Sequence, residues 1–323
     1  MEINKSTIRT MSILGQRGTL GITLADLAKD EPRVVALTAD LRNTSGLDRF
    51  AAAFPDRFFN VGIAEQNMIG IAAGLAAGGN IPFAATFSNF ASLRACEQIR
   101  HFMSYMRENV KLVGFGAGFS MGMFGVTHYA VEDLAAIRAM NDIVILSPSD
   151  GLSVYKAVRA AALHEGPVYL RLTGVMNSKI IYKEDYDFQI GKAVVLPGGG
   201  GEIAILAAGS LLNAAMGAAG LLEERDGIAA TVADVHTIKP IDGELLDRLS
   251  GCELIVTVEE HGTVGGLASA VSEYYAAKGK RPRQLPIGVS GPYQNAGDYA
   301  YMLEQYGLTE KAIYEKIIVA LAK

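Results

Sequence analysis

The chain has 323 residues, of which 50% are hydrophobic and 20% are charged, so it is long enough for about two domains and apolar for its length. A formal net charge of −5 argues against non-specific attraction to nucleic acid or to an anionic membrane surface. Cys96 and Cys252 form neither a metal-ligand spacing nor a disulfide framework, which favours a reducing compartment. The sequence shows no signal-peptide pattern and no apolar run that spans a bilayer. We therefore expect a cytoplasmic protein whose apolar surplus is buried between subunits.

The first part of the chain alternates short β-branched runs with longer helical patterns. This alternation is typical of a parallel sheet with crossover helices and predicts an α/β fold. The predicted strands are residues 34–37, 59–61, 81–85, 110–113, 143–146 and 168–172. The predicted helices are residues 19–28, 66–77, 92–106, 131–140 and 151–163.

A polar and aromatic segment, residues 177–188, interrupts this rhythm, and a second α/β series follows the four consecutive glycines at 198–201. The glycine run precedes a strand and lacks a following Lys-Ser/Thr pair, so we interpret it as a surface turn rather than a phosphate loop. We predict two domains, residues 1–188 and 189–323, each with a mostly parallel sheet flanked by helices. The predicted strands of the second domain are residues 203–206, 229–232, 254–258 and 285–288.

The segment F-F-N-V-G-I-A-E-Q-N-M, residues 58–68, places one carboxylate, Glu65, between a strand-like run and an almost charge-free helix. That helix, residues 69–79, is rich in Ala and Gly, which predicts close packing on a sheet or on another subunit. On pattern alone, such an acid is more often a helix cap or a first-turn acid that favours the helix dipole. The alternative is a carboxyl group that is sheltered from water and takes part in chemistry.

The motif V-G-I-A-E-Q-N and the helix behind it resemble the pyrimidine-binding domain of the transketolase family, whose enzymes depend on thiamine diphosphate. The segments D-V-H-T-I-K-P-I-D at 234–242 and V-E-E-H-G at 258–262 resemble the C-terminal domain of that family. The resemblance implies transfer of a two-carbon ketol unit from a ketose phosphate donor to an aldose phosphate acceptor. It also implies that Glu65 hydrogen-bonds N1′ of the aminopyrimidine and favours the imino tautomer, which takes the proton from the thiazolium.

Two aromatic residues, Phe87 and Phe90, follow a predicted strand three positions apart. Such a pair on one helix face either clamps a flat ring or packs in a core. The resemblance implies the first role, with both rings against the aminopyrimidine, and Leu93 stands where the family often has a tyrosine. Asp40, at a predicted strand end, resembles the acid near the thiazolium, although a helix-cap or turn role fits its pattern equally well.

His128 lies in G-V-T-H-Y-A-V-E-D, residues 125–133, a loop that enters a predicted helix. A lone histidine is more often structural than catalytic. The resemblance implies instead that His128 hydrogen-bonds hydroxyl groups of the donor sugar and assists proton transfer.

The resemblance also implies a substrate-phosphate site formed by Arg17 and Arg171, with Thr44 where a serine would help them. Guanidinium forks suit that task, although each arginine taken alone is more often a surface ion-pair residue. Two positions depart from the family, with Phe124 where an aspartate is usual and Gly116 where a second phosphate-contacting histidine is usual. An aromatic group in place of a carboxylate removes hydrogen bonds to a hydroxyl and narrows the channel, which points to a non-standard sugar substrate.

The family binds the diphosphate and Mg²⁺ through Gly-Asp-Gly and a following Asn on a separate domain, and no Gly-Asp-Gly occurs in this sequence. Without those oxygen ligands we expect no metal site in this chain. The resemblance therefore implies the C-terminal subunit of a split transketolase. An N-terminal partner subunit would carry the Gly-Asp-Gly…Asn motif and hold Mg²⁺ or Ca²⁺, in an α2β2-type heterotetramer with the cofactor between the chains.

Two other functions fit parts of the same pattern. The β subunit of a 2-oxo-acid dehydrogenase decarboxylase component has the same two domains, but it usually has a tyrosine-histidine-serine loop and no arginine matched to Arg17. A regulatory or scaffolding paralogue without chemistry would explain the two departures from the family. The intact motifs around Glu65 and His128 argue against it.

Overall fold

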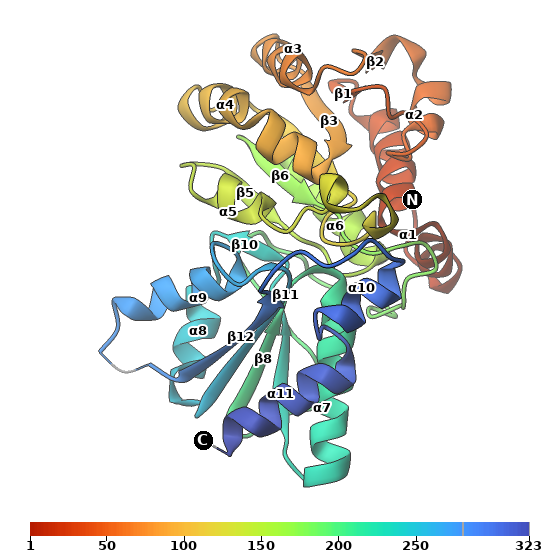
Figure 1. Ribbon diagram of the computed structural model, residues 1–323. Helices are drawn as coiled ribbons and strands as arrows, with labels where there is room; N and C mark the ends of the chain where they lie inside the picture. Colours follow the sequence, from red (N-terminus) through yellow and green to blue (C-terminus); the bar gives the residue numbers. More distant parts are fainter. Residues whose placement is uncertain (280, 323) are drawn as a thin grey trace.

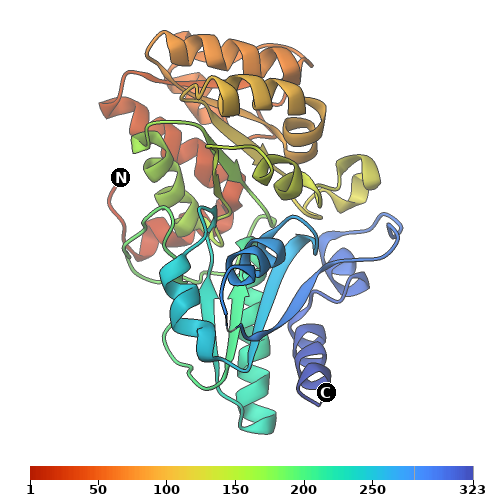
Figure 2. The same ribbon diagram turned by 90° about the vertical axis from the view of Figure 1, so that its left-hand side faces the viewer.

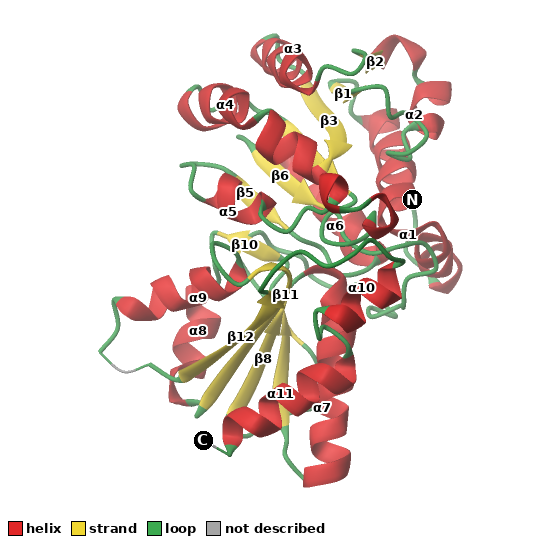
Figure 3. Ribbon diagram, viewed as in Figure 1, coloured by secondary structure: helices red, strands yellow, loops and turns green. Residues whose placement is uncertain are grey.

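The computed structural model describes residues 1–279 and 281–322. The chain forms two α/β bodies, each built on one sheet, which lie one above the other in Figure 1 and, turned by 90°, in Figure 2. Figure 3 shows helices flanking both sheets. The prediction of two mostly parallel sheets flanked by helices is confirmed. In the described part of the chain, no helix is both long and apolar enough to cross a membrane.

The first sheet has seven strands in the order β10-β5-β6-β4-β3-β1-β2. Strands β1 to β6 all pair in parallel. Most of their residues are buried on both faces, which explains why they appear in the sequence as continuous apolar runs rather than alternating ones. Their bounds are β1 (Val34–Thr38), β2 (Phe58–Asn60), β3 (Ile81–Phe87), β4 (Lys111–Phe115), β5 (Val144–Leu146) and β6 (Val168–Arg171).

Strand β10 (Thr237–Lys239) comes from the second series but pairs antiparallel with β5 at the edge of the first sheet. The sequence pattern does not predict this strand, because three residues are too few for a periodic signal. Residues 172–193, which include the predicted domain boundary after residue 188, form neither helix nor strand. The two bodies therefore share a sheet, and the boundary itself stays a prediction.

The second sheet has five strands in the order β12-β11-β8-β9-β7. Its strands pair in parallel except for β7, which runs antiparallel to β9 at one edge. The strand bounds are β7 (Val194–Val195), β8 (Ile203–Ala207), β9 (Ala230–Asp234), β11 (Leu254–Gly262) and β12 (Arg283–Val289).

Helices cover both faces of the first sheet. The apolar sides of α1 and α6 pack on one face, and those of α3 and α5 pack on the other. Helix α1 is interrupted at Gly15, whose φ of +66° and ψ of −174° are not helical, so the helix predicted over 19–28 lies in its second part. The first part, which was not predicted, begins after a capping box formed by Asn4 and Thr7. Where one continuous helix is predicted over 92–106, the chain instead forms π-helical turns around a short α4. The bounds are α1 (Lys5–Asp30), α2 (Asp48–Ala53), α3 (Glu65–Ala77), η2 (Phe90–Arg94), α4 (Cys96–Gln98), η3 (Ile99–Tyr105), α5 (Asp133–Arg138) and α6 (Gly151–Leu163).

The helices of the second body follow the same layered plan. Helices α7 and α11 bury apolar residues against one face of the second sheet, while α8 and α9 pack on the side nearer the first body. The bounds are α7 (Leu212–Asp226), α8 (Gly243–Arg248), α9 (Leu267–Ala276), α10 (Tyr299–Gln305) and α11 (Glu310–Leu321).

One hydrophobic cluster runs through the seam between the two bodies. It joins Leu37 and Met68 of the first body to Leu206, Val235 and Leu267 of the second. A seam packed like a core holds the two bodies as one unit, in contrast to the smaller and more polar interfaces that allow domains to move. The edge of the first sheet that faces this seam is therefore held in a fixed place.

Candidate active site

Several predicted site residues lie where the parallel strands of the first sheet end. Asp40 follows the end of β1, Phe87 is the last residue of β3, and Glu65 comes shortly after β2. Because parallel strands all run the same way, their carboxyl ends meet at one edge of the sheet. Ligands bind at this edge in open α/β folds. The loop after β4 carries Gly116 and His128 to the same place.

Glu65 is the first residue of α3, and its side chain is only 4% exposed. The N-cap of α3 is Ala64, so the capping role considered from the pattern does not belong to Glu65. Its Oε1 accepts a hydrogen bond from Nη1 of Arg94 at 2.8 Å. Glu65 is therefore a buried first-turn acid whose hydrogen bond runs to a side chain outside α3.

The two aromatic residues lie next to each other and to the histidine. The rings of Phe87 and Phe90 meet edge to face with centroids 5.6 Å apart. The ring of His128 lies 5.3 Å from Phe87 and 5.4 Å from Phe90. Phe87 belongs to β3 and Phe90 to η2, so the expectation of one shared helix face is wrong even though the rings are neighbours. Leu93 is exposed nearby in η2.

His128 ends a short 3-10 turn, η5 (Val126–His128), in the loop that leads to α5. Asn89 ties this loop down through a hydrogen bond from its side-chain amide to the Thr127 carbonyl at 2.5 Å. Burial and, after it, the charge of Arg94 lower the pKa of His128 below its ordinary value of 6.5. The imidazole is therefore neutral at pH 7, and its two nitrogens offer one donor and one acceptor.

Phe124 and Gly116, the two departures from the family pattern, both lie close to the aromatic residues of the candidate site. Phe124 is 64% exposed, and its ring centroid lies 5.1 Å from that of His128. Gly116 has a φ of +66°, and a Cβ atom there would lie 3.2 Å from the Phe87 ring and 3.0 Å from Cγ of Met121. Phe87 and Met121 therefore already fill the space that a side chain at position 116 would need. The exposed Phe124 ring forms an aromatic surface beside His128.

Asp40 lies at the rim of the site in a left-handed conformation, with a φ of +59°. Its backbone N–H donates to Oδ1 of Asn60 at 2.9 Å, and Nδ2 of Asn60 donates back to Oδ1 of Asp40 at 3.2 Å. Asn60 is the last residue of β2, so this pair links the ends of two neighbouring strands. Asn60 belongs to the Glu65 motif, but nothing in its local pattern indicates this role.

Arg17 and Thr44 lie together, as predicted from the resemblance. Nη1 of Arg17 donates to the backbone carbonyl of Thr44 at 3.0 Å. Both residues line a pocket of about 210 Å³, whose other charged residues are Asp48 and Arg49. Burial lowers the pKa of Arg17, and no carboxylate among the described residues counters that effect. A half-buried guanidinium without a carboxylate partner suits the binding of an anion.

Arg171 does not belong to this group, which corrects the prediction of a phosphate-binding role. Its side chain is 2% exposed and forms a fork with Asp133, Nε to Oδ2 at 2.8 Å and Nη2 to Oδ1 at 3.0 Å. Nη2 also donates to the carbonyls of Ala130 and Glu260, the second of which lies in the other body. Protein acceptors thus take the Nε and Nη2 atoms of this guanidinium, and the side chain is almost wholly buried, which favours a structural role.

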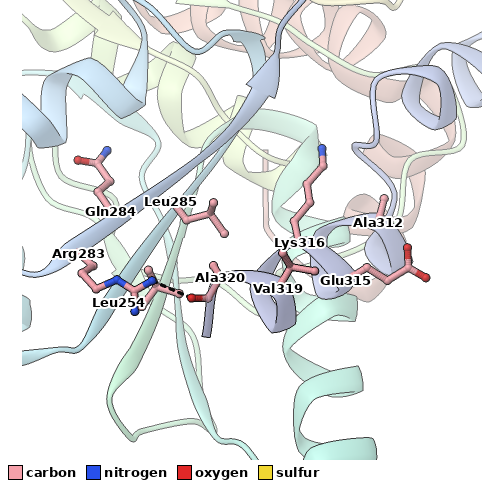
Figure 4. Close-up of a pocket in the computed structure, with 9 residues that line it drawn as sticks. All are labelled: Leu254, Arg283, Gln284, Leu285, Ala312, Glu315, Lys316, Val319 and Ala320. Atoms are coloured by element: carbon pink, nitrogen blue, oxygen red, sulfur yellow. Dashed lines mark hydrogen bonds between the residues drawn. The ribbon is translucent and has the colours of Figure 1, made fainter. Parts of the chain in front are cut away.

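A separate groove lies on the second body, between β12 and α11, far from these residues (Figure 4). Leu285 and Val319 form much of its wall, and Arg283 donates to the Ala320 carbonyl at 2.7 Å. The ammonium of Lys316 is already bonded to the Gly307 carbonyl at 2.8 Å. The acid that lines this groove, Glu315, is exposed, in contrast to the buried Glu65, so the groove is not the candidate active site.

Comparison with known proteins identifies the family. Residues 15–174 match the model of the transketolase pyrimidine binding domain, and residues 191–313 match that of the transketolase C-terminal domain. A putative transketolase C-terminal section from Methanocaldococcus jannaschii is 40% identical over 311 residues, which cover 96% of this chain and 97% of that protein. The chain belongs to the transketolase family.

Two further similarities extend along nearly the whole chain. The 6-deoxy-6-sulfo-D-fructose transketolase subunit SqwH of Clostridium sp. (strain MSTE9) is 38% identical over 298 residues, which cover 92% of this chain and 91% of SqwH. A solved structure described as a split gene transketolase in an inactive β4 tetramer superposes with a TM-score of 0.84 at 38% identity. That alignment covers 95% of this chain and 98% of the solved one.

The transketolase family depends on thiamine diphosphate, and the residues of this chain fit the pyrimidine end of that cofactor. A buried carboxylate stands beside two aromatic rings and a neutral histidine, which suits a flat heterocycle with polar edges. Within residues 1–279 and 281–322, no three His, Cys, Asp or Glu side chains gather as a metal site.

Arg94 lies in the candidate site and is not predicted from the sequence. It lies in η2, with its guanidinium bonded to Glu65 and its Cζ 3.8 Å from the centroid of the Phe90 ring. The one available signal was its spacing, because Arg94 comes four residues after Phe90 and such pairs share a face in a regular helix. Spacing alone does not indicate contact with Glu65, which lies 29 positions away.

Proposed function

We propose that this chain is the C-terminal subunit of a split transketolase. Together with an N-terminal partner that carries a Gly-Asp-Gly…Asn motif, it transfers a two-carbon ketol unit from a ketose to an aldose. The observation that carries the proposal is the buried Glu65 carboxylate beside Phe87, Phe90 and His128, in a chain whose sequence contains no Gly-Asp-Gly. The names of the relatives, a C-terminal section and a subunit, support the same division of labour.

Each residue of the proposed site has a defined task. Glu65 holds a hydrogen bond to N1′ of the aminopyrimidine, and its burial excludes water that would compete for that bond. The Phe90 ring would contact a flat face of the heterocycle, and the Phe87 ring, at 86° to it, would border the same space. When bound, thiamine diphosphate supplies the nucleophilic carbon and the electron sink for cleavage of the donor.

His128 and Asp40 act on the substrate side of the proposed site. The Nδ1 atom of His128 lies 3.0 Å from Oγ1 of Thr127, which leaves Nε2 for the substrate. The neutral imidazole would accept the proton of the donor-sugar hydroxyl whose carbon becomes the carbonyl of the released aldose as the carbon–carbon bond breaks. Asp40 lies at the rim, near the place proposed for the thiazolium, where Asn60 holds its carboxylate.

The anionic end of the substrate is assigned to Arg17 and the backbone around Thr44. Arg17 and Arg49 outnumber Asp48 among the charged residues that line their pocket, so its net charge is positive. Phe124 places an aromatic wall where a carboxylate would bind a hydroxyl, so we propose a non-standard sugar. A relative named for a sulfonated sugar, SqwH, agrees with an anionic substrate that is not an ordinary pentose phosphate.

The test is reconstitution. The chain is purified alone and together with the protein of a neighbouring reading frame that encodes Gly-Asp-Gly…Asn, and both samples are assayed with thiamine diphosphate, Mg²⁺ and pairs of sugar phosphates. We expect ketol transfer from the pair and neither cofactor retention nor turnover from the chain alone. Turnover by the chain alone would contradict the division of labour. Decarboxylation of 2-oxo acids with dye reduction, in place of sugar transfer, would contradict the reaction.

A further inference from the structure

Arg94 makes two contacts that meet at the centre of the proposed pyrimidine site. Its Nη1 donates to Oε1 of Glu65 at 2.8 Å, and its Cζ lies 3.8 Å above the centroid of the Phe90 ring. The Glu65 side chain is 4% exposed, whereas that of Arg94 is 45% exposed. A single guanidinium thus satisfies the buried acid and covers the face of the aromatic ring, with its own outer side toward solvent.

These two contacts are the ones that an aminopyrimidine would make. A guanidinium is flat and delocalised, with N–H donors at its edge and a face that stacks on aromatic rings. The proposed function requires an edge-on hydrogen bond to Glu65 and a face-on contact with Phe90 from the cofactor. At 3.8 Å the guanidinium is already in van der Waals contact with the ring, so no second flat group fits between them.

We propose that Arg94 occupies the pyrimidine site of the free subunit and that thiamine diphosphate must displace it. This inference rests on the proposed function and adds a residue that competes with the cofactor. In the free chain, Arg94 stabilises the fold by pairing with Glu65, because a buried carboxylate without a hydrogen-bonded partner lowers the free energy of unfolding. Displacement needs only a change of side-chain rotamer, since Arg94 is long, flexible and open to solvent on one side.

The charges around Arg94 allow its side chain to leave the proposed pyrimidine site. Among the described residues, Glu65 is the carboxylate within ion-pair distance of Arg94, and the stacking contact with Phe90 is the other interaction that holds the guanidinium. Once the cofactor satisfies Glu65, Arg94 is free to turn to the exposed side of η2. Its departure also removes the positive charge that helps to lower the pKa of His128.

The test combines a variant of Arg94 with a matched control on the same segment. Arg94→Met keeps the length and the apolar stem but removes the donors and the charge. Arg100→Met is the control, because Arg100 is 64% exposed and pairs with Glu97 on the surface at 3.3 Å. Binding is measured in the reconstituted assembly by equilibrium dialysis with thiamine diphosphate and Mg²⁺. Arg94→Met should bind the cofactor about fivefold more tightly, because the cofactor no longer has to break a half-exposed ion pair. Arg100→Met should bind the cofactor as the wild type does.

A second measurement uses the chain alone and no cofactor. Arg94→Met should lower the thermal unfolding midpoint of the free subunit relative to Arg100→Met, and adding Glu65→Gln should recover part of the loss. Cofactor binding that is equal or weaker in Arg94→Met would overturn the proposal, and so would equal midpoints for the two single variants. A wild-type assembly that binds no thiamine diphosphate would overturn the proposed function as well, which separates the two failures.

Discussion

Disrupting the buried ion pair of Arg171 and Asp133 tests whether Arg171 stabilises the fold or binds substrate. Replacing Arg171 by Met removes the guanidinium and leaves the Asp133 carboxylate, which is 0% exposed, with the Tyr169 hydroxyl at 2.8 Å as its remaining side-chain donor. The carbonyls of Ala130 and Glu260 lose a donor as well. Breaking a buried pair in this way costs about 3–5 kcal/mol of unfolding free energy.

The assay is urea unfolding of the isolated chain, followed by circular dichroism. The matched control is Arg107→Met, because Arg107 and Asp142 also pair at 3.0 Å but are 71% and 48% exposed. The control should lose at most about 1 kcal/mol. Adding Asp133→Leu to Arg171→Met should recover much of the loss, since two apolar side chains leave no unpaired charge.

A loss for Arg171→Met that is no larger than that of the control would refute the structural role. The phosphate-binding interpretation makes the opposite prediction. It expects unchanged stability and a raised KM for phosphorylated substrates in the reconstituted enzyme. The two measurements together therefore decide which task the arginine performs.

Three further outcomes are expected from the reconstituted enzyme. Glu65→Gln should lower ketol transfer about 10²–10⁴-fold while gel filtration shows an unchanged assembly, and undiminished activity would remove Glu65 from the mechanism. Arg17→Met should raise KM for phosphorylated substrates about tenfold and leave unphosphorylated sugars unaffected, and equal effects on both would argue against an anion site. Because burial, the larger of the two causes, lowers the pKa of His128 whether or not Arg94 is displaced, the neutral form persists below pH 6.5. The kcat/KM value should therefore stay level near pH 7 and fall only on the acid side of 6.5, and a fall of the same shape in His128→Asn would assign it to another group.

Much of the fold follows from local patterns in the sequence. The strands of both sheets are continuous apolar runs because most of their residues are buried on both faces, and such runs stand out without any knowledge of contacts. The Glu65 motif is also local, since the strand, the acid and the small-residue helix are consecutive in the chain. Each of these features can be recognised from a window of about ten consecutive residues.

The errors and omissions concern contacts between distant residues. Arg171 has the local appearance of a functional arginine at a strand end, and only the approach of Asp133 and of the second body shows that it is buried. Strand β10 is too short for a pattern and forms because β5 leaves an edge open to it. The π-helical turns between 90 and 105 replace a regular helix, and they bring Arg94 over Phe90.

The sequence by itself thus determined the two α/β bodies, the transketolase resemblance and the acid at the centre of the site. Only the tertiary structure decided which charged groups meet, because the partner of a buried charge is chosen by the packing of segments far apart in the chain. The free energy of a buried charge depends on its neighbours in space, and a one-dimensional pattern does not contain them. The pairing of Glu65 with Arg94 and that of Arg171 with Asp133 both have this origin.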